Sequence, residues 1–181
     1  MTEQQRYEVV AAEPGFELRR YPEHVVAEVE VDASFESAGN QAFRPLVSYI
    51  GNGGIAMTAP VVQSKDAGDD LDSAVTTMTE AGPGRYTVAF VMPDGSRLDE
   101  LPAPSDPRVR MRTVPEQMAA AARFSGRWSA SAYRTQVEKL LAGVAAAGYE
   151  VDGAPRYARF DPPWKPWFAR HNEVVVPVRR A

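Results

Sequence analysis

The sequence of 181 residues contains no cysteine and only two histidines, His24 and His171. The absence of cysteine excludes disulfides, thiolate metal sites and cysteine nucleophiles. Two histidines are too few for a metal site built from histidine alone. A basic excess is also missing, because 24 acidic residues outnumber 20 Lys and Arg and give a net charge of −4. General nucleic-acid binders are normally basic, so we expect no nucleic-acid partner.

Long apolar runs are missing as well. The most apolar stretch, residues 140–149, contains two glycines and is too short to span a membrane. The N-terminus is polar and lacks the apolar core of a signal peptide, so we expect a cytoplasmic protein with no membrane span. Arginine far outnumbers lysine and alanine is abundant, a bias typical of GC-rich bacterial genomes.

Several enzyme motifs are absent too. The sequence has no His-Glu-x-x-His, no Gly-x-Ser-x-Gly and no phosphate-binding Gly-Lys-Ser/Thr. We therefore assign no catalytic residue. With 44% apolar residues, the length suits one domain, residues 1–181, with its own core.

The residues that are present predict an α+β fold. Apolar residues recur at every second position around Tyr7–Val9, Phe16–Leu18 and Val25–Val31, which predicts half-buried strands with residues such as Arg19 and Glu28 on the polar side. Apolar spacings of three and four predict helices over 35–50 and 131–147. Met57 is expected to point inward from a later strand, and residues 74–79 and 86–92 to form a hairpin.

The second half of the sequence repeats the first. At an offset of 93 residues Pro22 matches Pro115 and Phe35 matches Trp128, and each helix is followed by strands. This order predicts two strand–helix–strand–strand repeats, about 16–92 and 108–178. Two such halves can join into one curved antiparallel sheet or barrel with helices against it.

The C-terminal stretch, residues 161–168, contains three prolines and three large aromatic residues, including Trp164. Prolines stiffen such a loop, and aromatic side chains in it make a flat apolar wall. Lys165, Arg170 and His171 flank the wall. This composition suits a flat apolar ligand that bears carboxylates, although the same aromatic residues could simply cover the open end of the sheet.

A set of motifs then resembles the SOUL haem-binding protein family. The motifs are Tyr7-Glu8-Val9, Arg20-Tyr21-Pro22, Met57-Thr58-Ala59-Pro60-Val61, Arg123-Phe124-Ser125-Gly126, Asp161-Pro162-Pro163 and Asn172-Glu173-Val174. The resemblance runs from about Tyr7 to Val178. It implies a distorted antiparallel β-barrel of about eight strands with two flanking helices, a duplicated fold shared with gyrase-inhibitor-like effector-binding domains.

The resemblance also implies non-covalent binding of haem or another tetrapyrrole. Carried over by position, Phe43 and Val47 of the first helix and Lys165 of the C-terminal loop are candidate binding residues. We add Trp164, Arg170 and His171 from their place in or beside that loop.

The family's axial histidine position is Arg20 here, so iron ligation is not inherited. It would have to come from His171, His24 or Met57, or be absent. We expect His24 to be a partly exposed strand residue, and we favour a ring bound by apolar contact over a ring ligated by histidine.

Three functions compete at this point. The first is haem or tetrapyrrole binding for trafficking or buffering, without a reaction. The second is a small-molecule effector or xenobiotic-binding module with Glu173 on the pocket floor, since related effector-binding domains meet ligand cations with a buried carboxylate on the last strand pair. The third, with the least support, is a hydrolase or haem-processing enzyme that uses Glu173 as general base.

Overall fold

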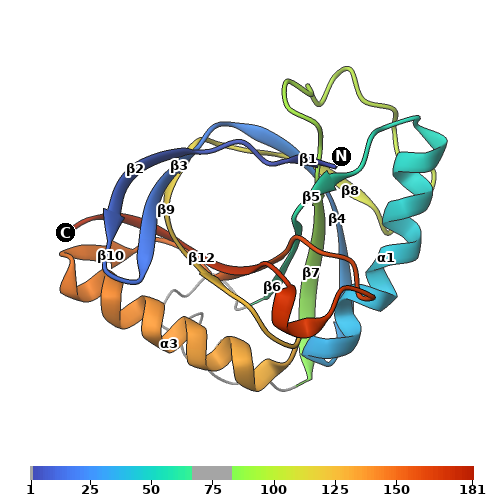
Figure 1. The fold of residues 1–181 in the computed structure, drawn as a ribbon. Coiled ribbons are helices and arrows are strands. Elements are labelled where there is room, and N and C mark those ends of the chain that lie inside the picture. The colour runs from blue at the N-terminus through green and yellow to red at the C-terminus, as the bar shows by residue number, and fades with distance from the viewer. Residues whose placement is uncertain (1, 67–82) are drawn as a thin grey trace.

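The computed structural model describes residues 2–66 and 83–181 and is built around one curved, antiparallel sheet with two long helices on its outer side (Figure 1). The α+β class expected from the sequence is therefore confirmed. The elements in chain order are β1 (Glu3–Gln4), β2 (Glu8–Glu13), β3 (Phe16–Tyr21), β4 (His24–Ala33), α1 (Phe35–Asn52), β5 (Thr58–Ala59), β6 (Val61–Lys65), β7 (Gly84–Val91), β8 (Arg110–Val114), β9 (Gln117–Phe124), α3 (Ala130–Ala146), β10 (Tyr149–Val151), β11 (Arg156–Arg159), the short 3₁₀ helix η1 (Trp167–Ala169) and β12 (Asn172–Arg180).

The strand order of the large sheet is β2-β3-β9-β12-β11-β6-β7-β4-β8, with β10 attached to β12. From β3 to β8 this order is symmetric about the β11–β6 pair, since β3 corresponds to β8, β9 to β4 and β12 to β7. Each half therefore contributes its first strand to the sheet of the other half. This is the arrangement that two joined strand–helix–strand–strand units would produce.

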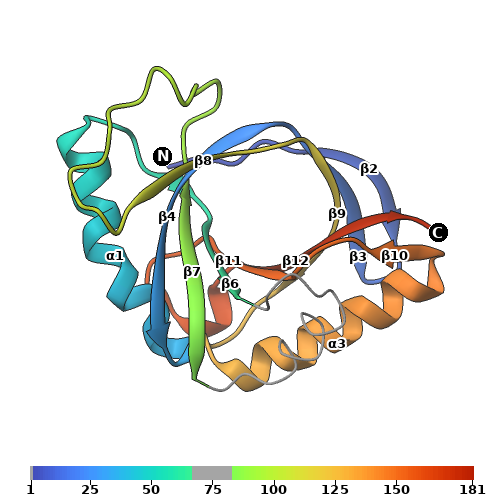
Figure 2. The ribbon, with the colours of Figure 1, turned by 180° about the vertical axis from the view of Figure 1, so that it is seen from behind.

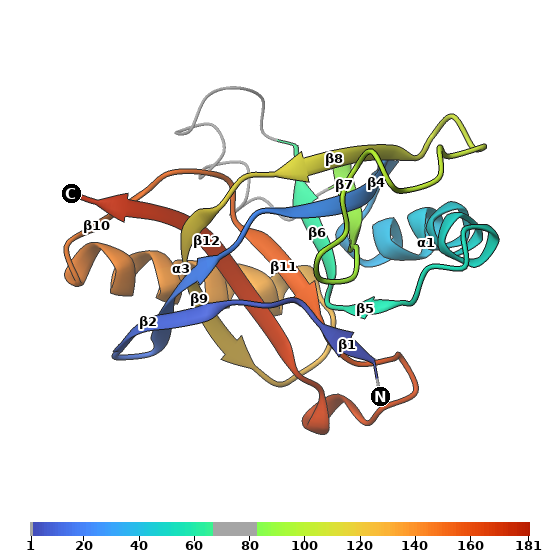
Figure 3. The ribbon, with the colours of Figure 1, turned by 90° about the horizontal axis from the view of Figure 1, so that it is seen from above.

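The sheet is open, so the expected barrel is not confirmed. Strands β2 and β8 are the ends of the order and do not pair with each other in the described part of the chain. A closed barrel needs a continuous ladder of hydrogen bonds around its circumference. Figures 1 and 2 show these two strands on opposite sides of the space that the sheet curves around. The N-terminal β1 pairs with β5 in a separate parallel pair across one end of that space (Figure 3).

Both helices begin at serine caps and lie within two residues of the expected ranges. The Ser34 side chain accepts a hydrogen bond from the Ser37 backbone, and the Ser37 side chain accepts one from the Ser34 backbone, which forms a capping box. Helix α1 continues through Pro45 to Asn52. Ser129 caps α3 in the same way through the backbone of Ala132. Among the described residues no helix is long and apolar enough to cross a membrane.

Alternation along the strands divides the sheet into two faces. Residues such as Val25, Ala27 and Val29 of β4 lie in the main core, between the sheet and the helices. The buried Phe35 of this core stacks on the partly buried Trp128, with ring centroids 5.1 Å apart. The 93-residue offset matches these two residues to each other, so the two halves meet here through equivalent positions.

Two expectations need correction or stay open. Met57 is 41% exposed and not inward-facing, because it precedes the two-residue strand β5 in a segment without regular structure. The second arm of the expected hairpin is β7, while residues 74–79 lie outside the described residues.

Candidate functional site

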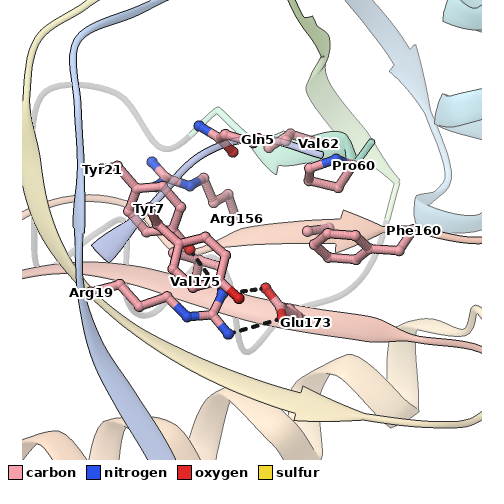
Figure 4. Close-up of a pocket in the computed structure, with 11 residues that line it drawn as sticks. Gln5, Tyr7, Arg19, Tyr21, Pro60, Val62, Arg156, Phe160, Glu173 and Val175 are labelled. Carbon is pink, nitrogen blue, oxygen red and sulfur yellow. Dashed lines mark hydrogen bonds and ion pairs between the residues drawn. The ribbon is translucent and has the colours of Figure 1, made fainter. Parts of the chain in front are cut away.

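The inner face of the sheet, opposite the helices, carries a small pocket that we call the Glu173 pocket (Figure 4). Its lining residues are Gln5, Tyr7, Arg19, Tyr21, Pro60, Val62, Arg156, Ala158, Phe160, Glu173 and Val175. They come from the N-terminal segment, from β3, β11 and β12, and from the start of β6. The free volume is about 10 Å³, room for about one water molecule, so no organic ligand enters without movement.

A buried ion pair forms the floor of this pocket. Arg19 donates to both carboxylate oxygens of Glu173, at 2.7 and 3.0 Å, and the two side chains are only 4% and 2% exposed. Arg19 also donates to the Tyr21 hydroxyl and to Glu17, and its guanidinium lies 4.0 Å from the centroid of the Tyr7 ring. The sequence pattern placed Arg19 on the polar side of its strand. That side is in fact the covered inner face, which explains why the residue is buried.

His171 is the second partner of Glu173. Its Nε2 lies 2.8 Å from Glu173 Oε1, and its ring stacks on Phe160 with centroids 4.0 Å apart. Burial by itself would raise the pKa of Glu173, but the hydrogen bonds from His171 and Arg19, with the charge of Arg19, together lower it. Glu173 is therefore an ionised carboxylate whose charge is already offset.

Arg156 lies beside this pair and differs from Arg19 in its hydrogen bonding and ion pairing. Its guanidinium sits 5.1 Å from the centroid of the Tyr21 ring. Among the described residues, its buried Nη2 has no hydrogen-bond partner and its side chain makes no ion pair. Burial lowers the pKa of Arg156, and the nearby charge of Arg112 adds to this effect. In the described part of the inner face, Arg19 is buried and fully paired, whereas Arg156 is partly buried and its Nη2 is unpaired.

A second, larger hollow adjoins Arg156, and we call it the valine hollow. Its volume is about 160 Å³. It is lined by Gln5, His24, Val26, Glu28, Val62, Ser64, Thr87, Ala89, Val91, Arg112, Val114, Ala154 and Arg156. Glu28, which alternation also placed on the polar side, is buried here and accepts hydrogen bonds from Arg110 and Arg112.

His24 belongs to the valine hollow and both of its ring nitrogens have partners. Nδ1 lies 2.9 Å from the Pro22 carbonyl oxygen, and Nε2 lies 3.1 Å from Gln5 Nε2. Burial lowers the pKa of His24, an effect that outweighs the hydrogen bond to Pro22. His24 is half-buried, as expected from the sequence, and is neutral at pH 7.

The C-terminal loop between β11 and β12 is held in place by hydrogen bonds within the loop. Asp161 accepts hydrogen bonds from Lys165 Nζ, at 2.7 Å, and from the backbone of His171. The Arg170 guanidinium donates to the backbone carbonyls of Lys165 and Pro163. Both candidate cations of the loop are therefore engaged within it.

The same loop exposes its aromatic side chains. Trp164 is 83% exposed, Phe168 66% and Trp167 49%, and the rings of Trp167 and Phe168 contact each other edge to face. Trp164 and Phe168 therefore face solvent, whereas Arg127, just beyond β9, lies over the half-covered ring of Trp167. On α1, Phe43 is 46% exposed and packs edge to face on Phe90, whereas Val47 is half-buried against the main core.

The residue set that carried the resemblance is matched by a family model. The model is described as SOUL heme-binding protein, and it matches residues 2–177. The chain belongs to the SOUL haem-binding protein family. In this SOUL chain the match covers both helices, the C-terminal loop and the sheet up to Pro177 of β12, and haem is the ligand named at the level of the family. No match was found among curated proteins.

Solved structures share the fold of this SOUL chain at low sequence identity. The C-terminal domain of EcmrR superposes with a TM-score of 0.69 at 15% identity, covering 97% of this chain and 99% of that one. EcmrR in a DNA complex gives 0.66 at 15% identity, with 97% and 58% covered. A hydrolase from Listeria innocua gives 0.60 at 13% identity, with 94% of each chain covered. Identities this low establish a common fold only.

The structure brings only some of the candidate residues together. Trp164, Lys165, Arg170 and His171 share one loop, while His24 lies on the inner face. The residues that sequence reasoning missed are Arg19 and Arg156. Arginine at an alternating strand position was the only signal for them, and it does not reveal which acid lies opposite.

Proposed function

We propose that this chain binds haem or a related tetrapyrrole non-covalently, as a carrier or buffer that performs no reaction of its own. Membership of the SOUL family over residues 2–177 is the observation that carries the proposal. The exposed aromatic residues of the C-terminal loop support it, because a soluble protein rarely displays several large apolar side chains together without a binding role.

The dimensions of the inner face argue against haem binding there. Pockets for ligands of this class measure about 300–1,000 Å³, which is about two to six times the volume of the valine hollow. We therefore place the tetrapyrrole on the outside, against Trp164, Trp167 and Phe168, with Phe43 and Val47 of α1 as the further candidates. The internal hydrogen bonds of the loop favour this role, because a platform that is already ordered loses little entropy on binding.

Apolar contact supplies most of the affinity in this proposal. An exposed Trp side chain that loses about 200 Å² of accessible surface contributes about 5 kcal/mol before the costs of association. Pairing of a propionate with Lys165 or Arg170 contributes about 0–1 kcal/mol at an exposed rim. Each pair would also have to compete with the existing bond of Lys165 to Asp161 or with those of Arg170 to the loop backbone.

The histidines fit iron ligation less well than the aromatic residues fit the ring. His171 Nε2 is engaged with Glu173, and both nitrogens of His24 have partners. Axial ligation by Nε2 of either residue would break one of these bonds. We propose that the ring is bound without a histidine ligand. If a histidine does ligate the iron, His171 is the better candidate because it adjoins the aromatic loop.

Titration of the purified protein with haemin, followed by the Soret band, tests the proposal. We expect a saturable shift at one-to-one stoichiometry and weaker binding in Trp164→Ala. The matched control is Leu98→Ala, an exposed apolar residue outside the loop, which should bind as the wild type does. His171→Ala and His24→Ala should leave the haem spectrum unchanged. Absence of a saturable shift would refute haem binding, and loss of a low-spin spectrum in either histidine variant would refute the ligand-free arrangement.

The second candidate is a small-molecule effector module that uses the inner face. The specific observation in its favour is the presence of two adjoining hollows there. A cation-binding role of Glu173 is not favoured, because Arg19 already offsets its charge. Use of Glu173 as general base in a hydrolase or haem-processing enzyme is not favoured either, because its lowered pKa leaves it a weak base at neutral pH.

A further inference from the structure

The valine hollow combines an apolar wall with an arginine that forms no ion pair with any residue that the structure describes. The wall consists of Val26, Ala89, Val91 and Val114, with Val62 packed against them, all on the inner face. Arg156 lies at its edge, where the hollow meets the Glu173 pocket. Such a combination is typical of sites for ligands with one apolar part and one charged group.

Among the described residues, the charged side chains that line the two hollows include one more cation than anions. Arg19 is paired with Glu173 and Arg112 with Glu28, at 2.7 and 3.2 Å. His24 is neutral, since burial lowers its pKa. Arg156 is the remaining cation. Its buried Nη2 has no acceptor among residues 2–66 and 83–181, and a buried N–H group without an acceptor costs free energy that a ligand acceptor would recover.

The size of the hollow limits the apolar part of the ligand to about one ring. A dry protein cavity of about 150 Å³ accommodates benzene, and the valine hollow measures about 160 Å³. The guanidinium fork matches a planar carboxylate, to which it can donate two parallel hydrogen bonds. One surplus positive charge balances one carboxylate.

We infer that the valine hollow is a binding site for a small aromatic monocarboxylate, with the ring against the valines and the carboxylate on Arg156. The site shares no residue with the aromatic loop proposed for haem, so each can exist without the other. The ligand charge is opposite to that of the second candidate function, in which Glu173 would meet a ligand cation.

Calorimetric titration with benzoate is the direct test, with benzamide as neutral isostere and benzylamine as cation. We expect saturable one-to-one binding of benzoate, with benzamide about tenfold weaker or more, since a charge-assisted hydrogen bond commonly contributes that much. Arg156→Gln should weaken benzoate by a similar factor and abolish the preference over benzamide. Arg179→Gln, at an exposed arginine paired with Glu150, is the matched control and should bind as the wild type does.

Two further measurements keep the test decisive if Arg156→Gln folds poorly. Arg156→Lys keeps the charge but loses the fork, and should bind benzoate more weakly than the wild type. Amide chemical shifts of the wild-type protein should move on benzoate addition around Val62, Ala89 and Ala154. The inference is overturned if benzoate and benzamide bind alike, if Arg179→Gln matches Arg156→Gln, or if the shifts fall only in residues 161–170. Haemin titration of Arg156→Gln should be unchanged, which separates this site from the haem proposal.

Discussion

Removal of the Arg19 side chain should destabilise the protein strongly and in a pH-dependent way. The substitution Arg19→Met keeps most of the apolar stem but leaves the Glu173 carboxylate, which is 2% exposed, without its bidentate partner. Loss of one member of a buried ion pair costs about 3–5 kcal/mol. For a protein of this length the melting temperature should fall by about 6–20 °C at pH 7.

The unfolding free energy lost in Arg19→Met should become smaller as the pH falls. In the wild type the folded-state pKa of Glu173 lies below its ordinary value, because the bonds from His171 and Arg19 outweigh burial. The stability from this group is therefore present above about pH 4.3, the pKa of an unfolded Glu, and is lost as the pH falls through the folded-state pKa. In Arg19→Met only His171 still opposes burial, so the pKa of Glu173 should lie higher than in the wild type, and the stability deficit of the variant should grow as the pH rises. The two stabilities should approach each other near pH 4.

Urea unfolding of both proteins from pH 4 to pH 8 measures this difference. The matched control is Arg20→Met on the same strand, whose partner Glu8 lies at 2.9 Å but is 67% exposed. That exposed pair is worth about 0–1 kcal/mol at most. The double variant Arg19→Met/Glu173→Met should recover much of the loss, since no buried charge remains. The reasoning would be refuted if Arg19→Met lost the same unfolding free energy at pH 4 and at pH 8. It would also be refuted if the double variant lost as much as Arg19→Met.

Three further predictions concern the helices. Val47→Glu should lower haem affinity more than stability if this half-buried residue borders the ligand, and a thermal melt showing an unfolded variant at room temperature would assign it to the core instead. Ser34→Ala should cost about 1 kcal/mol of unfolding free energy through loss of the α1 cap, whereas the exposed Ser131→Ala should cost little; equal costs by urea unfolding would contradict this. Gly39→Ala should destabilise by about 1 kcal/mol or more, because the added Cβ meets the Arg159 guanidinium that stacks on Trp128; unchanged urea unfolding would show that Arg159 moves aside freely.

Local features of the fold were predictable, and closure of the sheet was not. The spacing of Tyr133, Val137, Leu140 and Val144 predicts a helix, and these residues are the buried stripe of α3. Hydrophobic periodicity and helix-capping residues depend only on residues close together in the chain, so they can be identified directly in the sequence. Whether β2 and β8 pair depends on accumulated twist and curvature over the whole sheet, which no local pattern encodes.

Some residues of the candidate site were also predictable from the sequence, and others were not. Aromatic residues of the C-terminal loop were identified because they lie together in sequence, between residues 161 and 168. The partnership of Arg19 and Glu173 spans 154 positions, and the chain offers many arginines that could have faced this acid. Alternation indicates which side of a strand a residue occupies. It does not show that the inner face of this sheet is also covered. Arg19 and Arg156 have their roles because this face is covered.

The sign of the ligand accepted by the inner face should therefore depend on β3, although the acid itself is on β12. With Arg19 present, the negative charge of Glu173 is offset by its ion pair. The positive charge of Arg156, which is unpaired among the described residues, then sets the electrostatic preference of the two hollows. In Arg19→Met the cations and anions lining the hollows become equal in number, and Glu173, in the pocket next to the valine hollow, keeps only His171 as a partner in the described part of the chain. Benzyltrimethylammonium should then stabilise the variant in thermal melts at pH 7, by the mass-action effect of a ligand that binds only the folded state, and should leave the wild type unchanged. Stabilisation of both proteins to the same extent would show that Arg19 does not control the charge preference of this face.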